Sequence, residues 1–286
     1  MGGVRRSGGC PARHATDLGG FGYRPVMAED QGADAQYLGV DIGGSGVKGA
    51  PVDLLRGRLV GERKRIPTPQ PATPSAVAGV VADIAKHFDW AGPIGVTYPG
   101  VVRHGVARTA ANVDDGWIGT DVRDLIERRS GSTVTVINDA DAAGLAELEF
   151  GAARDHAGVV MLLTIGTGIG SALLVNGALV PNTEFGHLEI RGRSAESRAS
   201  DLVRETKNLS WEDWAERFNE VLVAFEGWFW PDLFVLGGGA SKRFDKFGHL
   251  LDTRTPVVPA ELRNEAGIVG AALAAARAEA PAAVAR

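Results

Sequence analysis

Cysteine is almost absent from this 286-residue sequence, since Cys10 is the only one. A single thiol excludes an internal disulfide framework and a cysteine-rich zinc site. No stretch reaches the roughly 18 uninterrupted apolar residues of a membrane-spanning helix. Basic residues are not in excess either, with 30 Lys and Arg against 35 Asp and Glu and a net charge of −5. We therefore expect no membrane segment, no nucleic-acid partner and a cytoplasmic location.

The two ends of the sequence differ from its middle. Residues 1–36 are rich in glycine and lack both apolar periodicity and the apolar stretch of a secretory signal. We expect a disordered extension there, or a start of translation at Met27 instead. The final AALAAARAEAPAAVAR predicts a helix that fades into a tail.

Between these ends, apolar strands alternate with amphipathic helices, which predicts an α/β fold. Each half of the sequence has strands, a glycine-rich turn and helices behind them. A strand is expected over Leu59–Ile66, and a helix capped by Ser75 follows the prolines after it. Further strands are PIGVTY, TVTVIND, GVVMLLTI, GIGSALLV and DLFVLGG, and further helices are DVRDLIERRS, DADAAGLAELEF, LSWEDWAERFNEVLVAFEGWFW and NEAGIVGAALAAARA.

Three glycine-rich turns follow apolar strands: DIGGSGVKG, TIGTGIG and LGGGAS. Glycines at such places let backbone N–H groups approach an anion closely, so the three turns together predict phosphate binding. Each turn alone would equally suit a tight hairpin. Gly44–Gly49 match the sequence pattern G-x-G-x-x-G. They do not form a dinucleotide-binding motif, because a strand rather than a helix is expected after them.

Carboxylates stand at two of the strand ends. Asp41, beside the first turn, could hold Mg²⁺ directly or through water, or could simply cap the turn. Asn138 and Asp139 precede a helix, where an Asp is ordinarily an N-cap. The functional alternative is that Asp139 accepts a proton from a substrate hydroxyl while Asn138 bonds neighbouring hydroxyls.

Glu184, His187 and Glu196 follow the second glycine turn. Their side chains supply several donors and acceptors, as recognition of a polyol requires. Metal ligation is the competing interpretation, which the lack of cysteine and of a second nearby histidine disfavours.

Together these motifs resemble the ROK sugar kinases of the actin/hexokinase-like superfamily, and within them the polyphosphate glucokinases. The matching pieces are DIGGSGVKGA, TYPGVV, NDADAAGLAE, LTIGTGIGSAL, EFGH, AESRAS, LGGGASK and NEAGIVGAAL. They occur in the family order over about residues 37–276. The resemblance implies two domains around a sugar cleft: residues 37–137 with 267–286 as the small one, and residues 138–266 as the large one.

The resemblance also implies roles for individual residues. Asp139 is the catalytic base. The sugar contacts are Asn138, Glu184, His187 and Glu196, with Pro99 and Gly100 shaping the pocket. The phosphate turns comprise Asp41, Gly43, Gly44, Ser45 and Lys48, then Gly166, Thr167 and Gly168. Gly237, Gly238 and Gly239 lie where a nucleotide docks.

One segment departs from most ROK members, because LEIRGRSA stands where they carry a cysteine-rich zinc motif. No structural zinc is therefore expected, as in the polyphosphate glucokinase branch. The resemblance to the polyphosphate glucokinases implies the activity. It is the transfer of phosphate from polyphosphate, and also from ATP, to the 6-hydroxyl of glucose, with Mg²⁺ as cofactor. An ATP-dependent glucokinase or glucomannokinase, a non-catalytic sugar sensor and an acetylamino-sugar kinase remain alternatives.

Two further features have competing interpretations. Lys242 and Lys246, with Lys48 and Arg243, could guide a long polyphosphate chain, although the KRFDK run could equally be an exposed helix face. The tryptophan-rich helix from Trp211 to Trp230 has helical spacing, which favours packing or a dimer interface over carbohydrate stacking. A homodimer is expected from the resemblance.

Overall fold

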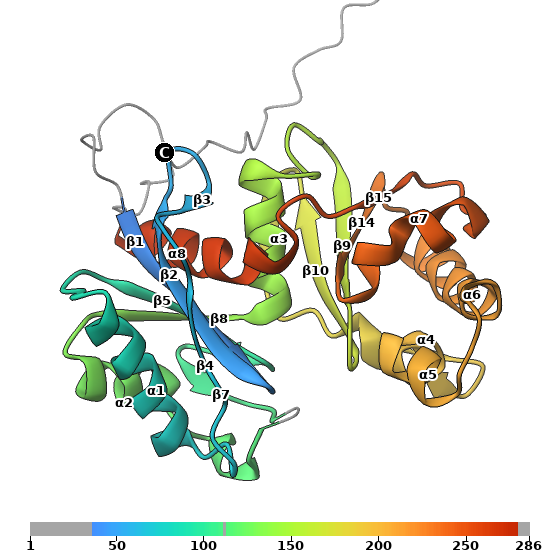
Figure 1. Ribbon diagram of the computed structural model, residues 1–286. Coiled ribbons are helices and arrows are strands. Elements are labelled where there is room, and N and C mark those ends of the chain that lie inside the picture. Colours follow the sequence, from blue (N-terminus) through green and yellow to red (C-terminus); the bar gives the residue numbers. More distant parts are fainter. Residues whose placement is uncertain (1–35, 111–112, 280–286) are drawn as a thin grey trace, which may run out of the picture.

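The computed structural model describes residues 36–110 and 113–279, so the predicted extension before Gln36 and the tail after Glu279 lie outside the described residues. Two sheets stand side by side with helices between and outside them (Figure 1). The predicted α/β class is confirmed. No helix in the described part of the chain is long and apolar enough to cross a membrane.

The first sheet has the strand order β3-β2-β1-β5-β8, with β4 also paired to β2. β1 and β2 form an antiparallel hairpin, whereas β1, β5 and β8 run parallel. The strands are β1 (Gln36–Gly43), β2 (Gly46–Asp53), β3 (Arg58–Leu59), β4 (Lys64–Ile66), β5 (Ile94–Tyr98) and β8 (Val134–Asn138).

The second sheet has the order β11-β10-β9-β14-β15 and repeats this pattern. β9 and β10 form an antiparallel hairpin, and β9, β14 and β15 run parallel. The repetition that the sequence suggested is therefore a repetition of strand pairing. The strands are β9 (Val159–Ile165), β10 (Ile169–Val175), β11 (Ala178–Val180), β14 (Leu233–Gly238) and β15 (Val257–Pro259).

Smaller elements complete the chain. Two short hairpins are formed by β6 (Val102–Arg103) with β7 (Val106–Ala107), and by β12 (Glu189–Ile190) with β13 (Arg193–Ser194). The helices are α1 (Pro74–His87), α2 (Val122–Ser130), α3 (Asp139–Phe150), α4 (Ala195–Ala199), α5 (Asp201–Thr206), α6 (Trp211–Phe229), α7 (Phe244–Phe247) and α8 (Ala266–Glu279). The 3₁₀ turns are η1 (Asp115–Trp117), η2 (Phe185–His187), η3 (Ala240–Arg243), η4 (Gly248–Leu250) and η5 (Arg263–Glu265).

Alternating side chains explain how the second sheet is covered on both faces. Val160 and Leu162 of β9 join a core with α3 and α8, whereas Met161 and Leu163 join a core with α6. This is the period of two that a strand imposes. The aromatic side chains Trp214, Phe218 and Phe225 of α6 are fully buried in that core, which confirms packing as their main role.

Helix α8 contacts β1, β5 and β8 of the first sheet and also contacts α3, so the last helix of the chain lies between the sheets (Figure 1). Its backbone comes unusually close to its neighbours. A Cβ added to Gly39 or Gly95 would overlap a carbonyl oxygen of α8, and one added to Gly270 would overlap that of Ala142 in α3. Glycine at these positions is therefore required by the packing.

Two local predictions are wrong. The strand expected over Leu59–Ile66 is broken into β3 and β4, because Gly61 takes a left-handed φ of 81° between them. The cap of α1 is Thr73, not Ser75, since Pro74 occupies the first helical position. The Ser75 hydroxyl instead accepts a hydrogen bond from Arg129.

Candidate active site

Asp139 stands at the first position of α3, directly after β8. The N-cap of α3 is Asn138, whose side-chain oxygen accepts the N–H of Asp141 at 2.9 Å. The interpretation of Asp139 as the cap is therefore wrong. Its Oδ1 accepts the adjacent Ala140 N–H at 2.9 Å, and the side chain is only partly exposed. Burial first, and then the charges of Asp41 and Glu184, raise the pKa of Asp139 to about 7. Such a carboxyl is suited to proton transfer near neutral pH.

Asn138 is buried, and its amide also donates to the carbonyl of Gly100 at 3.1 Å. This bond ties the start of α3 to the Pro99-Gly100 turn after β5. Each atom of the amide retains one further hydrogen-bonding position. Asn138 can thus fix the turn and still reach a ligand.

Glu184, His187 and Glu196 come together around the histidine ring. His187 Nδ1 lies 3.9 Å from Glu184 Oε2, and its Nε2 lies 3.5 Å from Glu196 Oε1. Burial, followed by the neighbouring Glu196, raises the pKa of Glu184, although His187 opposes the shift. All three side chains stay at least partly exposed, so their polar atoms can bond a hydroxylated ligand.

The second glycine turn is in contact with this cluster. Ile169, the residue after the turn, donates its N–H to Glu196 Oε2 at 3.4 Å, and a Cβ on Gly168 would collide with the same carboxylate. Gly166 accepts the N–H of Leu202 at 3.2 Å, while Thr167 is exposed at the tip. The turn of Gly166, Thr167 and Gly168 therefore adjoins the Glu196 side chain.

The first glycine turn joins β1 to β2, with Gly44 and Ser45 exposed at its tip. Thr68 donates to the Gly43 carbonyl, and Arg65 donates to that of Ser45 at 2.8 Å. Arg65 was not predicted from the sequence. The pairing of β4 with β2 places Arg65 opposite Lys48, and this contact between separate strands follows from the fold rather than from a local sequence pattern.

Asp41 lies on β1 and points to the α8 side of the first sheet. Its Oδ1 accepts the hydroxyl of Thr97 at 2.9 Å, and Oδ2 lies 3.5 Å from Lys48 Nζ. Among residues 36–110 and 113–279, no three His, Cys, Asp or Glu side chains gather to hold a metal by themselves. Mg²⁺ needs only one or two carboxylates besides phosphate oxygens and water, so Asp41 beside the first glycine turn fits that ion.

The third glycine turn ends β14. Gly238 has a φ of 79°, and a Cβ there would collide with the backbone of Ile165. Gly237 packs beside Thr164, and Gly239 lies near Asp201. The turn thus lies against the end of β9, the strand that leads into the second glycine turn.

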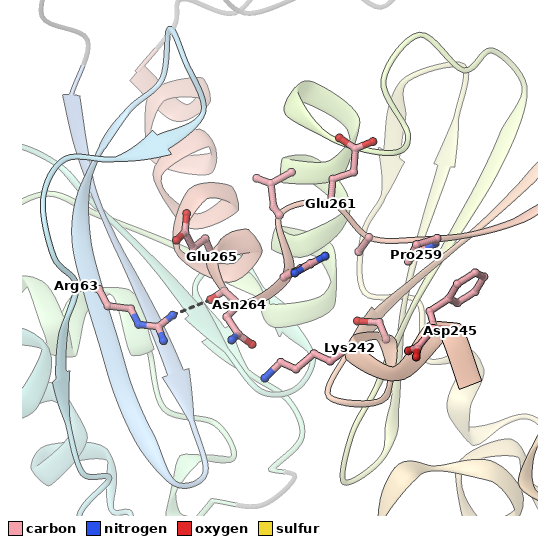
Figure 2. A pocket seen from close by; sticks show the side chains of 12 residues that line it. Arg63, Lys242, Asp245, Pro259, Glu261, Asn264 and Glu265 are labelled. Carbon is pink, nitrogen blue, oxygen red and sulfur yellow. Dashed lines mark hydrogen bonds between the residues drawn. The ribbon is translucent and has the colours of Figure 1, made fainter. Parts of the chain in front are cut away.

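Lys242 follows this turn and lines a pocket of about 870 Å³ between the two sheets (Figure 2). Arg63 reaches in from the first sheet and donates to the Asn264 carbonyl at 3.5 Å. Arg263 adds a third basic side chain, and Asp245, Glu261 and Glu265 add acidic ones. Lys246 is exposed on α7 but does not line this pocket. Arg63 and Arg263, unpredicted from the sequence, meet Lys242 only in the folded chain.

Asp141 is a buried carboxyl behind the site. Its Oδ2 accepts the N–H of Asn182 at 2.7 Å, and its Oδ1 has no partner among the described residues. The Asn182 side chain bonds the N–H and carbonyl of Val102 at 2.8 and 2.9 Å. This network fixes the segment that leads to Glu184 against α3 and β6. Burial is the main reason that the pKa of Asp141 rises to about 7.

We expect the Asp141→Asn variant to flatten the pH dependence of stability. The pKa is near 7 in the folded protein but near 4 when unfolded, so the folded state holds an extra proton between these values. The free energy of unfolding therefore falls as pH rises from about 4 to 7, by on the order of 2–4 kcal/mol for this group. Asparagine mimics the protonated form and removes this contribution.

Urea unfolding between pH 5 and 8 measures the effect. The variant should gain stability relative to the wild type as pH rises. Curves that stay parallel over this range would contradict the role of Asp141.

Comparison with known proteins agrees with this architecture. Each of the two sheets pairs an antiparallel hairpin with parallel strands, and α3 and α8 lie between the sheets. This is the actin/hexokinase-like fold of sugar kinases. The chain belongs to the ROK family, whose model matches residues 37–200.

One relative is the polyphosphate glucokinase of Mycobacterium tuberculosis (strain CDC 1551 / Oshkosh), 56% identical over 253 residues, which cover 87% of this chain and 96% of that protein. Among solved structures, the inorganic polyphosphate/ATP-glucomannokinase of Arthrobacter sp. strain KM has a TM-score of 0.83 and 50% identity, covering 86% of this chain and 100% of that one. A ROK family glucokinase from Streptomyces griseus, with a TM-score of 0.71 and 23% identity over 85% of this chain and 99% of that one, shares the fold.

Proposed function

We propose that this chain transfers a phosphoryl group from inorganic polyphosphate, and also from ATP, to the 6-hydroxyl of glucose. The observation that carries the proposal is the position of Asp139 at the start of α3. Burial first, and then the charges of Asp41 and Glu184, raise its pKa, so the carboxylates beside the first glycine turn and in the His187 cluster both lie near it. The polyphosphate glucokinase relatives at 56% identity support the choice of acceptor and donor.

In the proposed reaction, Asp139 accepts the proton of the 6-hydroxyl while the sugar oxygen bonds to the terminal phosphorus. The bond from that phosphorus to the bridging oxygen breaks, and the shortened polyphosphate or ADP leaves with the electron pair. Glu184, His187, Glu196 and Asn138 orient the sugar hydroxyls. The backbone N–H groups of the first two glycine turns stabilise negative charge on the phosphoryl oxygens.

Mg²⁺ held by Asp41, directly or through water, would supply further positive charge to those oxygens. The Thr97 hydroxyl and the Lys48 ammonium hold the Asp41 side chain in place for this role. Lys48 can also turn its charge toward a phosphate.

We also propose that the chain closes around its substrates as two lobes, residues 37–137 with 267–286 and residues 138–266. The junction falls near the end of β8, between Ile137 and Asn138. Packing of α8 against β1 and β5 supports the assignment of the last helix to the first lobe. Closure would exclude water from the phosphoryl group.

A homodimer in the cytoplasm completes the proposal. Val223, Trp228 and Trp230 are 47%, 52% and 68% exposed at the C-terminal part of α6, and they offer an apolar surface for a second copy. Sedimentation velocity of the purified protein measures the oligomeric state.

The proposed function is tested by glucose 6-phosphate formation with Mg²⁺ and a single donor. Turnover with polyphosphate supports the full proposal. Turnover with ATP alone would leave an ATP-dependent glucokinase or glucomannokinase, for which mannose as acceptor is the further test. Glucose binding without turnover from either donor would instead indicate a sugar sensor.

We expect Lys242→Glu to weaken polyphosphate use more than ATP use. Lys242 shares the pocket between the sheets with Arg63 and Arg263, where a polyanion meets basic groups from both sides. The KM for polyphosphate should rise about tenfold or more, as expected for loss of a charge-assisted contact of 1.5–3 kcal/mol.

The matched control is Lys246→Glu, an equal charge change on the same surface but outside the pocket. It should change the KM for polyphosphate less than Lys242→Glu does. An equal loss with both donors for Lys242→Glu would argue against a polyphosphate track at this residue.

A further inference from the structure

A separate pocket of about 270 Å³ lies among α4, the end of α5, α6 and the β12–β13 hairpin. It is lined by Arg193, Ser197, Arg198, Lys207 and Arg217. None of these residues belongs to the predicted sugar or phosphate sites. Four of the five side chains are cationic, and no carboxylate lines the pocket. The pocket therefore has a strongly positive wall.

Most of this charge is not neutralised. Glu220 forms ion pairs with Arg198 and, at 3.0 Å, with Arg191, which leaves one acid for two guanidinium groups. Arg193, Lys207 and Arg217 have no ion pair or side-chain hydrogen bond with any residue in the described part of the chain. Asp213, one turn before Arg217 on α6, accepts from its capping Ser210. Bringing like charges together costs free energy that a bound anion would offset.

Arg198 supplies an independent observation. Its side chain is only 18% exposed, and its Nε is buried without an acceptor among the described residues. A buried charged donor without a hydrogen-bond partner destabilises the folded protein. A ligand oxygen in the pocket would satisfy it.

We propose that this pocket binds a phosphate-type oxyanion. Guanidinium groups match phosphate oxygens with paired hydrogen bonds, and several cations favour an anion of multiple charge. The volume lies below the roughly 300–1,000 Å³ of drug-sized ligand sites, which suits an ion or a short phosphate chain. The Ser197 hydroxyl donates to the Ser194 carbonyl at 2.8 Å, so the basic side chains provide the binding groups.

The pocket is connected to the predicted sugar site through α4. This helix carries Glu196, which pairs with His187, and Arg198, which lines the pocket two residues later. The identity of the anion depends on the proposed function. If the protein uses polyphosphate as donor, distal phosphate units of that chain are one source of the anion. Separate inorganic phosphates are the other source.

Isothermal titration calorimetry with tripolyphosphate tests the site. The titration is run with a non-hydrolysable ATP analogue saturating the donor site. The wild type should bind one equivalent, and binding should weaken with salt as screening increases. In the Arg193→Glu/Arg217→Glu variant the affinity should fall at least tenfold. Arg123→Glu, an equal charge change per residue on α2, is the control and should retain binding.

The proposal is overturned if the wild type binds no tripolyphosphate under these conditions, or if the double variant binds it as tightly as the wild type. The Arg193→Ala/Arg217→Ala pair serves the same purpose if the glutamates impair folding, which thermal melting reveals. Failure of the proposed function would be seen separately, as absence of glucose 6-phosphate from the wild type.

Chain length distinguishes the two sources of phosphate. In one outcome, the double variant has a higher KM for long polyphosphate but unchanged kinetics when tripolyphosphate or ATP is the phosphoryl donor. That result identifies the anion in the pocket as a distal unit of the polyphosphate donor. Unchanged KM for long polyphosphate together with lost tripolyphosphate binding identifies a separate phosphate ligand. Either result supports an oxyanion site in this pocket.

Discussion

The Asp139→Asn variant should bind glucose and yet lose turnover by a factor of about 10²–10⁴, the range that general acid–base catalysis contributes. Asparagine keeps the side-chain oxygen that accepts the Ala140 N–H, so the start of α3 should hold its geometry. It cannot accept the proton of the sugar hydroxyl. A coupled assay of glucose 6-phosphate measures the loss, and calorimetry with glucose measures the binding.

The pH profile of the wild type belongs to the same prediction. The base is active as the carboxylate, so kcat/KM should rise with pH through about 7, the pKa of Asp139. The residual activity of the variant should lack this rise. Near-normal turnover in the variant would exclude Asp139 as the base.

The second large effect is expected from Gly270→Ala in α8. A single methyl group there would overlap the carbonyl oxygen of Ala142, which is backbone and cannot rotate away. The two helices would have to separate, and overpacking of this kind costs about 1–3 kcal/mol or more. We expect the variant at the upper end of that range or unfolded, as measured by chemical denaturation.

Gly79→Ala is the matched control. Gly79 lies inside α1, and nothing stands within 4 Å of an added Cβ. Alanine should therefore stabilise the protein by about 0.5–1 kcal/mol, since it favours the helix over the unfolded chain. If Gly270→Ala were as stable as Gly79→Ala, the close approach of α3 and α8 would not be a feature of the folded protein.

Much of the fold could be predicted from local patterns. The apolar run of β9 and Gly131, which ends α2 with a φ of 75°, are local signals that the structure reproduces. The break between β3 and β4 does not follow from the local sequence, because a glycine within a strand-like segment does not show that Gly61 takes a left-handed φ. The cap of α1 lies two residues before the predicted Ser75, because Pro74 favours the first helical position.

The residues of the candidate site also fall into those that local sequence motifs indicate and those that only the fold brings together. Asp139, Glu184, His187 and Glu196 could be selected because they lie in short motifs after glycine turns or strands. Their catalytic and binding roles remain predictions. Thr97, Asn182 and Arg63 could not be selected, since each gains its position from partners more than 50 residues away in the chain. Contacts of that range follow from tertiary packing rather than from a local pattern.

The position of α8 has a consequence for synthesis on the ribosome. The parallel strands of the first sheet are all translated once Asn138 has been added, but α8, which covers one face, begins only at Ala266. At roughly 5–20 residues per second, the helix follows on the order of ten seconds later. Until then α1 and α2 can protect only the opposite face. The first half of the sequence therefore reaches its native packing only after α8 has been made.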